Sequence, residues 1–257
     1  VWGGIDQIAR SDVNMVMTVN PQTKTILLTS IPRDSYVTLH SFGAKDKLTH
    51  SGIYGVEETV STVEDWLGYD MNYYIKANFS MLVDIVNAID GVDVYSDFEF
   101  KSSVADYYYV QGENHLDGMA ALYFARERKS FEDEDIERGR NQQKVLKAMI
   151  SKATQSKVIL TKYTQLLDAV EDEMQTNMSE KDISSLVKMQ INDMGKWTIN
   201  TISITGTDAY APTYSMGSQE LAVVIPDETS VEAAKQAIHD TMYPAYTKEK
   251  KNKSQTK

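Results

Sequence analysis

The chain has 257 residues, of which 42% are hydrophobic and 25% charged, as in an ordinary globular protein with one large domain or two small ones. Its formal net charge of −11 argues against a nucleic-acid duplex as the main partner, because duplex binding depends on neutralising phosphates. The absence of cysteine excludes disulfides and thiolate metal sites, no apolar stretch is long enough to span a bilayer, and the N-terminus does not resemble a signal peptide.

Two β-rich runs open the chain. Residues 13–19 and 25–31 are joined by Asn20-Pro21-Gln22-Thr23, a turn composition, and they predict a hairpin. Apolar residues then recur at helical spacing over residues 56–67, and Gly68 follows as a stop signal. The remaining predictions are strands over residues 72–77, 92–95 and 197–204, and helices over residues 80–89, 116–126, 136–153, 157–171, 181–194 and 231–243.

Strands and helices alternate along most of the chain. This alternation favours a three-layer α/β arrangement over separate domains. We therefore expect one domain over residues 1–247. Residues 248–257 form a lysine-rich polar stretch that predicts a disordered tail.

The six arginines are confined to three short charged segments, whereas lysines occur along the whole length. An arginine fork makes two parallel hydrogen bonds to a phosphate or carboxylate and stays charged when desolvated. The pattern therefore suggests an anion site. Structural pairs between arginines and carboxylates are an equal alternative, because each segment also carries acidic residues: Asp12, Asp34, Glu127 and Glu137.

The usual catalytic signatures are missing, including the nucleophile elbow, the zinc-binding helix and the phosphate-binding glycine loops. The four histidines are isolated from one another in the sequence. Catalysis would therefore rest on carboxylates, arginines and a hard metal ion. No general base can be identified from these patterns.

Two pairs of residues suggest how the later arginines are arranged. Arg126 and Arg128 follow an apolar helical run, and both could turn toward one ligand if the chain leaves the helix in an extended conformation. Arg138 and Gln142 are four residues apart, so they would share a face of the next helix.

Asp12 begins the first predicted strand, and Arg33 and Asp34 end the second, so a hairpin would place them at one edge of the sheet. This arrangement suits Mg²⁺ with a phosphate, and it equally suits an ion pair that closes the sheet edge. The predicted helix over residues 80–89 is apolar on most faces, as expected for a core helix or for the wall of a lipid pocket.

Several ordered segments together resemble the LytR-CpsA-Psr family, and the resemblance runs from about Arg10 to the region of Met178. Four ordered motifs with compatible spacing make this resemblance specific. The four motifs are Arg10-Ser11-Asp12-Val13-Asn14-Met15, Thr29-Ser30-Ile31-Pro32-Arg33-Asp34, Asp46-Lys47-Leu48-Thr49-His50, and Phe124-Ala125-Arg126-Glu127-Arg128 followed by Arg138-Gly139-Arg140-Asn141-Gln142-Gln143. A further stretch, Met174-Gln175-Thr176-Asn177-Met178, also fits the family.

The resemblance implies an α-β-α sandwich with a central mixed sheet and a hydrophobic lipid channel with arginines at its mouth. It implies a Mg²⁺-dependent phosphotransferase that moves teichoic acid or capsular polysaccharide from an undecaprenyl-diphosphate carrier to peptidoglycan. Such a protein is anchored to the membrane and acts on the outer face of a Gram-positive cell. The alternative is a protein that binds polyprenyl phosphates, or a diphosphatase, without glycan transfer.

The resemblance also assigns site residues. Asp12 corresponds to a Mg²⁺-associated aspartate, and Lys47 to a lysine near the head group. Arg33, Arg126 and Arg128 would both bind the diphosphate and take part in catalysis. Asp34 would also take part in catalysis, either as a base or by orienting Arg33. The proposed diphosphate ligands are Arg33, Lys47, Arg126, Arg128, Arg138, Arg140 and Gln142.

One aspartate that the family resemblance leads us to expect is not matched in this sequence. The family carries a further aspartate in a Gly-x-Asp turn about a dozen residues before Asp12, which would fall upstream of Val1. Gly4-Ile5-Asp6 imitates that turn at too short a spacing, so the role is not transferred to Asp6. We therefore expect this chain to be truncated at its N-terminus, without the family's first strand and membrane anchor.

Overall fold

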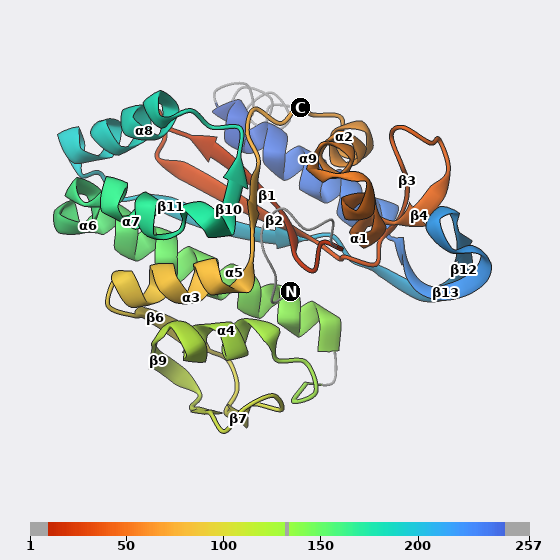
Figure 1. Ribbon diagram of the computed structural model, residues 1–257, viewed down its shortest axis with the longest axis horizontal. Coiled ribbons are helices and arrows are strands. Elements are labelled where there is room, and N and C mark those ends of the chain that lie inside the picture. Colours follow the sequence, from red (N-terminus) through yellow and green to blue (C-terminus); the bar gives the residue numbers. More distant parts are fainter. Residues whose placement is uncertain (1–9, 132–133, 245–257) are drawn as a thin grey trace, which may run out of the picture. The chain divides into compact units, whose positions relative to one another are not determined.

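The computed structural model describes residues 10–131 and 134–244 (Figure 1). The chain divides into two compact units. One, here called the sheet unit, contains residues 10–70 and the segment from Trp197 onward, and the other, the helical unit, contains residues 71–196. Asp6 and the predicted tail over residues 248–257 lie outside the described residues.

The sheet unit is built on a mixed sheet in the order β1-β2-β11. β1 (Asn14–Asn20) and β2 (Thr25–Ile31) are antiparallel, with Asn14 opposite Ile31, and β11 (Thr198–Ser203) is parallel to β2. β2 is the central strand, and six of its seven residues are buried. Burial along almost the whole length of a strand is expected where both of its faces are covered.

Helix α9 (Glu228–Met242) packs on all three strands of this sheet. Its buried residues Val231, Ala234 and Ile238 recur at helical spacing and form one apolar stripe. The turn after β1 is fixed by Asn20, whose side-chain oxygen accepts hydrogen bonds from two backbone N–H groups while its Nδ2 donates to Thr241 O at 2.8 Å. This turn therefore ties the first hairpin to the last helix.

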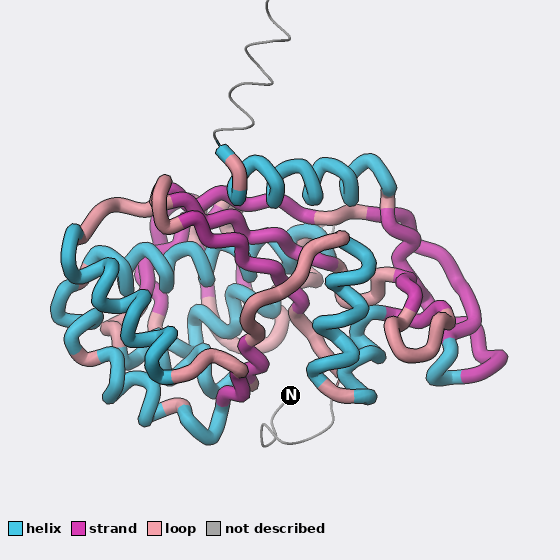
Figure 2. The backbone as a smooth tube through the Cα atoms, turned by 90° about the horizontal axis from the view of Figure 1, so that it is seen from above, coloured by secondary structure: helices cyan, strands magenta, loops and turns pink. Residues whose placement is uncertain are grey.

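Shorter elements complete the sheet unit. Helix α2 ends at Gly68, whose φ of 75° a glycine adopts readily, and the predicted stop is confirmed. The β12–β13 hairpin packs beside the β3–β4 hairpin (Figure 2). The elements are β3 (Tyr36–Thr38), β4 (Lys45–Lys47), α1 (Leu48–Ser51), η1 (Gly52–Tyr54), α2 (Val56–Leu67), β12 (Gly206–Thr213), η3 (Tyr214–Met216) and β13 (Gly217–Pro226).

The helical unit combines helices with two-stranded sheets. Its strands pair as β5 (Ile75–Ala77) with β10 (Met174–Thr176), β6 (Val92–Ser96) with β9 (Gly112–Leu116), and β7 (Phe100–Lys101) with β8 (Tyr108–Tyr109). Its helices are α3 (Phe79–Ala88), α4 (Gly118–Arg126), α5 (Glu134–Gln155), α6 (Lys157–Thr161), α7 (Tyr163–Ala169), η2 (Glu171–Glu173) and α8 (Glu180–Asp193).

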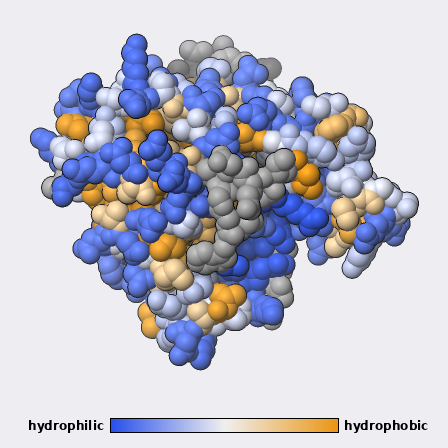
Figure 3. All heavy atoms as spheres, viewed as in Figure 1, coloured by the Kyte–Doolittle hydropathy of each residue, from blue (hydrophilic) through white to orange (hydrophobic). Residues whose placement is uncertain are grey.

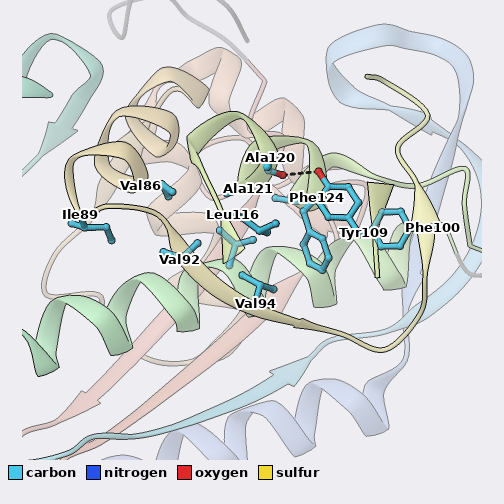
Figure 4. Close-up of a cluster of buried hydrophobic side chains, with 12 residues drawn as sticks. Val86, Ile89, Val92, Val94, Phe100, Tyr109, Leu116, Ala120, Ala121 and Phe124 are labelled. Carbon is cyan, nitrogen blue, oxygen red and sulfur yellow. Dashed lines mark hydrogen bonds between the residues drawn. The ribbon is translucent and has the colours of Figure 1, made fainter. Parts of the chain in front are cut away.

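The core of the helical unit lies between α3, α4, α5 and the β6–β9 pair (Figure 4). Phe100, Tyr109 and Phe124 form its aromatic part, with ring centroids 4.8 to 5.6 Å apart. The buried hydroxyl of Tyr109 donates to Ala120 O at 2.7 Å, which satisfies its polar group inside an apolar core. This core holds the C-terminal end of α4 in place, where two of the predicted site arginines lie.

The predicted α/β class and mixed sheet are confirmed. Several bounds differ from prediction. Leu116 ends β9 and Asp117 caps α4, and the predicted helix over residues 157–171 divides at Lys162. The strand predicted over residues 72–77 is shorter, and the last helix begins three residues earlier than predicted. The hairpin over residues 206–226 was not assigned from sequence. Among the residues that the structure describes, no helix combines the length and the apolar character needed to cross a membrane.

Candidate functional site

The Arg33 cluster, defined as Asp12, Arg33, Asp34 and Lys47, lies at one edge of the central sheet. Asp12 precedes β1 and Arg33 follows β2, and the register with Asn14 opposite Ile31 brings them to the same end, as predicted. Arg33 Nη1 lies 2.6 Å from Asp12 Oδ1. Both side chains keep about a third of their surface exposed, at 30% and 34%. This contact is therefore partly screened by solvent.

Asp34 completes the cluster by contacting both cations. Its Oδ2 lies 3.5 Å from Arg33 Nε, and its Oδ1 lies 3.0 Å from Lys47 Nζ. Two carboxylates thus balance two cations. The contacts of Asp34 suit the orientation of Arg33 better than proton transfer, and its role as a base stays a prediction.

Several buried polar atoms close to the Arg33 cluster make no hydrogen bond with any described residue. The backbone connects three of their residues, because Ser11 N donates to Thr49 O at 3.2 Å and Thr49 N donates to Arg33 O at 2.7 Å. Buried polar groups are normally paired, so these atoms keep hydrogen-bonding capacity that no described residue uses. Sequence reasoning assigned Arg33 to the site but missed the other four residues, although three of them lie within the quoted motifs. The atoms are Ser11 Oγ, Asn14 Nδ2, Arg33 Nε, Ser35 Oγ and Thr49 Oγ1.

The residues near Asp12 meet the demands of Mg²⁺ only in part. Mg²⁺ takes one or two carboxylates and fills its remaining positions with water and substrate oxygens. Asp12 offers one carboxylate whose Oδ1 already accepts from Arg33. No group of three or more acidic or histidine side chains that could hold a metal occurs within residues 10–131 and 134–244. Asp12 thus fits a Mg²⁺ ion only where phosphate oxygens supply further ligands.

The Arg126 turn, defined as residues 126–128, carries the second group of arginines. Arg126 is the last residue of α4, and Glu127 has extended backbone angles, φ −62° and ψ 137°. The chain therefore leaves the helix in the extended conformation that a shared ligand of Arg126 and Arg128 would require. The Arg126 guanidinium lies over the ring of Phe79 on α3, 5.1 Å from its centroid. Such a contact holds the cation without neutralising it.

Glu127 is fully buried between the two arginines. Its Oε1 accepts from the backbone N–H groups of Arg128 and Ser130, at 3.0 and 3.2 Å, and its Oε2 accepts from that of Ser103 at 2.6 Å. Burial alone would raise the pKa of Glu127, but these hydrogen bonds lower the pKa below its ordinary value. Glu127 therefore remains a carboxylate that fixes the backbone of the Arg126 turn.

Helix α5 carries the remaining predicted phosphate ligands. Arg138 and Gln142 are four residues apart on one face of α5, whereas Arg140 is offset by two residues and lies on another. Arg140 Nη1 donates to Glu137 Oε1 one turn earlier, and Arg140 remains exposed. This pairing gives Arg140 a structural contact, and its predicted role in diphosphate binding stays a prediction.

The predicted site residues therefore fall into two groups, one in each unit. Asp12, Arg33, Asp34 and Lys47 belong to the sheet unit, and the others belong to the helical unit. Within the sheet unit, side-chain contacts join the four predicted residues. In the helical unit, Arg126 and Arg128 share one turn, whereas Arg138, Arg140 and Gln142 share one helix. Their convergence on one ligand stays a prediction, as does the hydrophobic channel.

A serine, a histidine and an aspartate also meet in the sheet unit, around the buried side chains of Asp46 and His50. His50 Nδ1 lies 2.6 Å from Asp46 Oδ1 and 2.8 Å from Ser215 Oγ, and Ser215 N donates to Asp46 Oδ2 at 2.8 Å. A nucleophilic relay needs the serine and the aspartate on opposite ring nitrogens. Both contact Nδ1 here, so this trio is a structural network and not a catalytic triad.

The hydrogen bonds of this network control the charge on Asp46. Burial alone would raise its pKa, but hydrogen bonds from His50, from Ser215 and from the backbone N–H of Lys47 lower the pKa below its ordinary value. A buried carboxylate therefore stays ionised directly beside Lys47 in the sequence.

Comparison with known proteins identifies the family. The profile of the LytR_cpsA_psr family matches residues 3–237, which include every predicted site residue. This chain belongs to the LytR-CpsA-Psr family. A curated relative is the polyisoprenyl-teichoic acid–peptidoglycan teichoic acid transferase TagU of Bacillus mycoides, which is 37% identical over 180 residues, covering 70% of this chain and 58% of that protein. The chain thus spans about three-fifths of the length of the curated relatives it matches.

Solved structures of the LytR-CpsA-Psr family share the fold. The crystal structure of B. subtilis TagV is 31% identical, with a TM-score of 0.73, covering 91% of this chain and 90% of that one. The structure of TagT bound to LIIa-WTA is 29% identical, also with a TM-score of 0.73, covering 91% of this chain and 86% of that one. The structural likeness therefore extends over both units.

Proposed function

We propose that this chain transfers a teichoic acid or a related anionic glycopolymer from a polyprenyl-diphosphate carrier to peptidoglycan. Membership of the LytR-CpsA-Psr family and the names of the TagU relatives support this reaction. The structure of TagT bound to LIIa-WTA supports the class of donor. Both the lipid carrier and peptidoglycan place this reaction on the outer face of the cytoplasmic membrane.

The observation that carries the proposal is the Arg33 cluster with its surrounding polar atoms. Arg33 and Lys47 are partly exposed cations. In the same region lie the hydroxyl groups of Ser11, Ser35 and Thr49, which have no hydrogen-bond partner among the described residues. Charge-assisted hydrogen bonds to a phosphate contribute about 1.5–3 kcal/mol each, so several donors together bind a diphosphate firmly. A solely structural ion pair would not need additional unsatisfied donors around it.

The chemistry is phosphoryl transfer. A sugar hydroxyl of the acceptor attacks the sugar-linked phosphorus of the donor, a new P–O bond forms, and the bond to the bridging oxygen breaks. Prenyl monophosphate leaves, and the hydroxyl proton passes to solvent or to a base. Arg33, Arg126 and Arg128 stabilise the charge that develops on the leaving phosphate, since positioning and electrostatics dominate such reactions.

Mg²⁺ belongs to the same proposal, with Asp12 as its protein ligand. When bound, the ion neutralises negative charge on the diphosphate. Asp34 orients Arg33 and Lys47 through the contacts described above. Lys47, Arg138, Arg140 and Gln142 complete the proposed diphosphate ligands.

The lipid chain of the donor needs an apolar surface, and α3 offers one. Met81, Leu82 and Ile85 are apolar, yet each keeps part of its surface exposed. In Figure 3, apolar atoms are interspersed among polar ones over the helices of the helical unit. These partly exposed side chains support a path for the prenyl chain along α3.

A radiolabelled prenyl-diphosphate glycopolymer tests the proposal when it is incubated with and without peptidoglycan. We expect label to enter peptidoglycan only when the acceptor is present. Arg126→Ala and Arg138→Ala should each weaken donor binding by about tenfold while leaving the thermal unfolding midpoint unchanged. Lys101→Ala, which removes an exposed cation of the helical unit, should bind as the parent does.

Two outcomes contradict this proposal. Release of prenyl phosphate without acceptor, and without transfer in its presence, identifies a diphosphatase. Unchanged donor affinity in Arg126→Ala or Arg138→Ala contradicts the assigned role of that arginine.

A further inference from the structure

Three aromatic rings form a cluster on the sheet unit that the proposed donor chemistry does not use. The aromatic platform is defined as Phe42, Tyr54 and Tyr214. Phe42 stacks on Tyr214 with ring centroids 4.8 Å apart and packs against Tyr54 at 4.6 Å. The three side chains are nonetheless exposed, at 38%, 40% and 49%. Clustered exposed aromatic rings mark interaction sites more often than isolated apolar residues do.

Buried hydrogen bonds hold the aromatic platform in place. Tyr214 precedes Ser215, whose backbone N–H donates to the buried carboxylate of Asp46 at 2.8 Å. Tyr36 Oη donates to Pro212 O at 2.8 Å and fastens the same hairpin to β3. The β12–β13 hairpin packs beside the shorter β3–β4 hairpin (Figure 1). Phe42 lies in the turn between β3 and β4. The rings are thus preorganised, which reduces the entropy cost of binding.

The charge around the aromatic platform favours an uncharged ligand. Partial burial raises the pKa of Tyr54, and the nearby carboxylates of Asp46 and Glu58, which carry negative charge at neutral pH, raise it further. This negative potential repels a polymer of phosphate diesters but not a chain of neutral sugars. Tyrosine also offers a ring face for the C–H surface of a pyranose and a hydroxyl group for its polar edge.

Strand β4 connects the aromatic platform to the proposed donor site. Asp46 and Lys47 are adjacent on β4, so their side chains leave opposite faces of the strand. Lys47 contacts Asp34 of the Arg33 cluster on one side, while Asp46 holds Ser215 on the other. A ligand on the aromatic platform would therefore lie one strand away from the cations that we assign to the diphosphate.

We propose that the aromatic platform binds the acceptor as an uncharged glycan strand, an assignment that rests on the proposed transfer function. The rings stack on successive sugars, and the buried network of Asp46 and His50 keeps them aligned. The platform is a binding surface and takes no part in the chemical step.

Isothermal titration with chitohexaose, a neutral chain of β-1,4-linked N-acetylglucosamine, tests this proposal on the whole chain. We expect Tyr214→Ala and Tyr54→Ala each to weaken its binding by about tenfold, since each removes one stacking ring. Tyr214→Phe keeps the ring and should bind within about twofold of the parent. Tyr95→Ala, which removes a tyrosine exposed at 54% on the helical unit, is the matched control and should have no effect.

In the transfer assay, Tyr214→Ala should raise KM for peptidoglycan by about tenfold and leave donor KM unchanged. Two results contradict the glycan-binding role of the platform without affecting the proposed transfer function. One is a parent protein that transfers polymer but does not bind chitohexaose, and the other is weakened donor binding in Tyr214→Ala. If Tyr214→Ala changes only the self-association of the protein, measured by sedimentation, the platform is a contact between two copies of the chain and not a glycan site. Chitohexaose binding that depends on Tyr214 in a protein without transfer activity refutes the proposed function instead and retains the platform as a glycan site.

Discussion

The Arg33 cluster and the Arg126 turn hold arginines in opposite ways. Arg33 is held through its side chain, by the carboxylates of Asp12 and Asp34. In the Arg126 turn the backbone is held instead, because Glu127 accepts hydrogen bonds from its N–H groups, and Arg126 rests on an aromatic ring.

The difference matters for an anionic ligand. A phosphate that binds Arg33 must share the guanidinium with a carboxylate or displace it, so binding there has a competing interaction within the protein. A phosphate that binds Arg126 meets a cation that rests on the uncharged ring of Phe79. We expect metal ions and salt to change phosphate binding mainly at the Arg33 cluster of the sheet unit. The Arg126 turn of the helical unit should contribute more to the affinity for phosphate.

The largest effect should follow from removing the buried carboxylate of the Arg126 turn. Glu127→Ala leaves three backbone N–H groups without their acceptor, so we expect the free energy of unfolding to fall by about 3 kcal/mol. Chemical denaturation measures this change. Glu113→Ala removes an exposed glutamate of the same unit and should stay within about 0.5 kcal/mol of the parent. A small effect in Glu127→Ala would show that the turn is held by other contacts.

The same residue gives a pH test. The pKa of Glu127 is lowered on folding, so its contribution is fully present above the unfolded-state pKa and is lost as pH falls through the folded pKa. We expect the stability gap between the parent and Glu127→Gln to be widest at neutral pH and to narrow in acid. A gap that widens in acid would contradict the ionised state assigned here.

A smaller effect should come from removing the competitor of Arg33. In magnesium-free buffer, Asp12→Asn should bind prenyl diphosphate about fivefold more tightly, because one carboxylate no longer competes for the guanidinium. Fluorescence titration with a labelled prenyl diphosphate measures this. Asp106→Asn removes the carboxylate partner of Lys101, an exposed cation outside the proposed ligands, and is the matched control, with an expected change below twofold. Weaker binding by Asp12→Asn would instead assign Asp12 to the positioning of Arg33.

The smallest effect should come from the aromatic support of Arg126. Phe79→Leu keeps an apolar side chain but removes the ring face, and a partly exposed contact of this kind contributes about 0.5–1 kcal/mol. Donor binding should therefore weaken by about two- to fivefold with the unfolding midpoint nearly unchanged. An unchanged affinity would show that Arg126 needs no support from α3.

Sequence reasoning succeeded where local patterns decide structure. The first hairpin and the helix over residues 56–67 follow from alternation, helical spacing and strong turn or stop residues, and the structure has them within one residue. The edge shared by Asp12 and Arg33 follows from that hairpin. The long hairpin over residues 206–226 was missed, although it forms one of the largest strand pairs of the described chain.

The roles of individual carboxylates were harder to foresee. Asp12, Asp34 and Glu137 pair with arginines, as the structural alternative proposed. Glu127 has the same kind of sequence neighbours but accepts from backbone N–H groups, one of them at Ser103, 24 positions earlier. Partners brought together only by tertiary folding leave no periodic signal in the sequence. For the same reason the contacts of Asp46 with Ser215, 169 positions apart, could not be predicted.

The parallel pairing of β2 with β11 has a consequence for biosynthesis. β2 is complete at Ile31, but its second neighbour begins only at Thr198, after the whole helical unit has been made. Until β11 has been made, β2 has an unpaired edge, and this edge can pair with strands of other chains. Nascent chains stalled before this point should aggregate, and chaperones that shield strand edges should protect them.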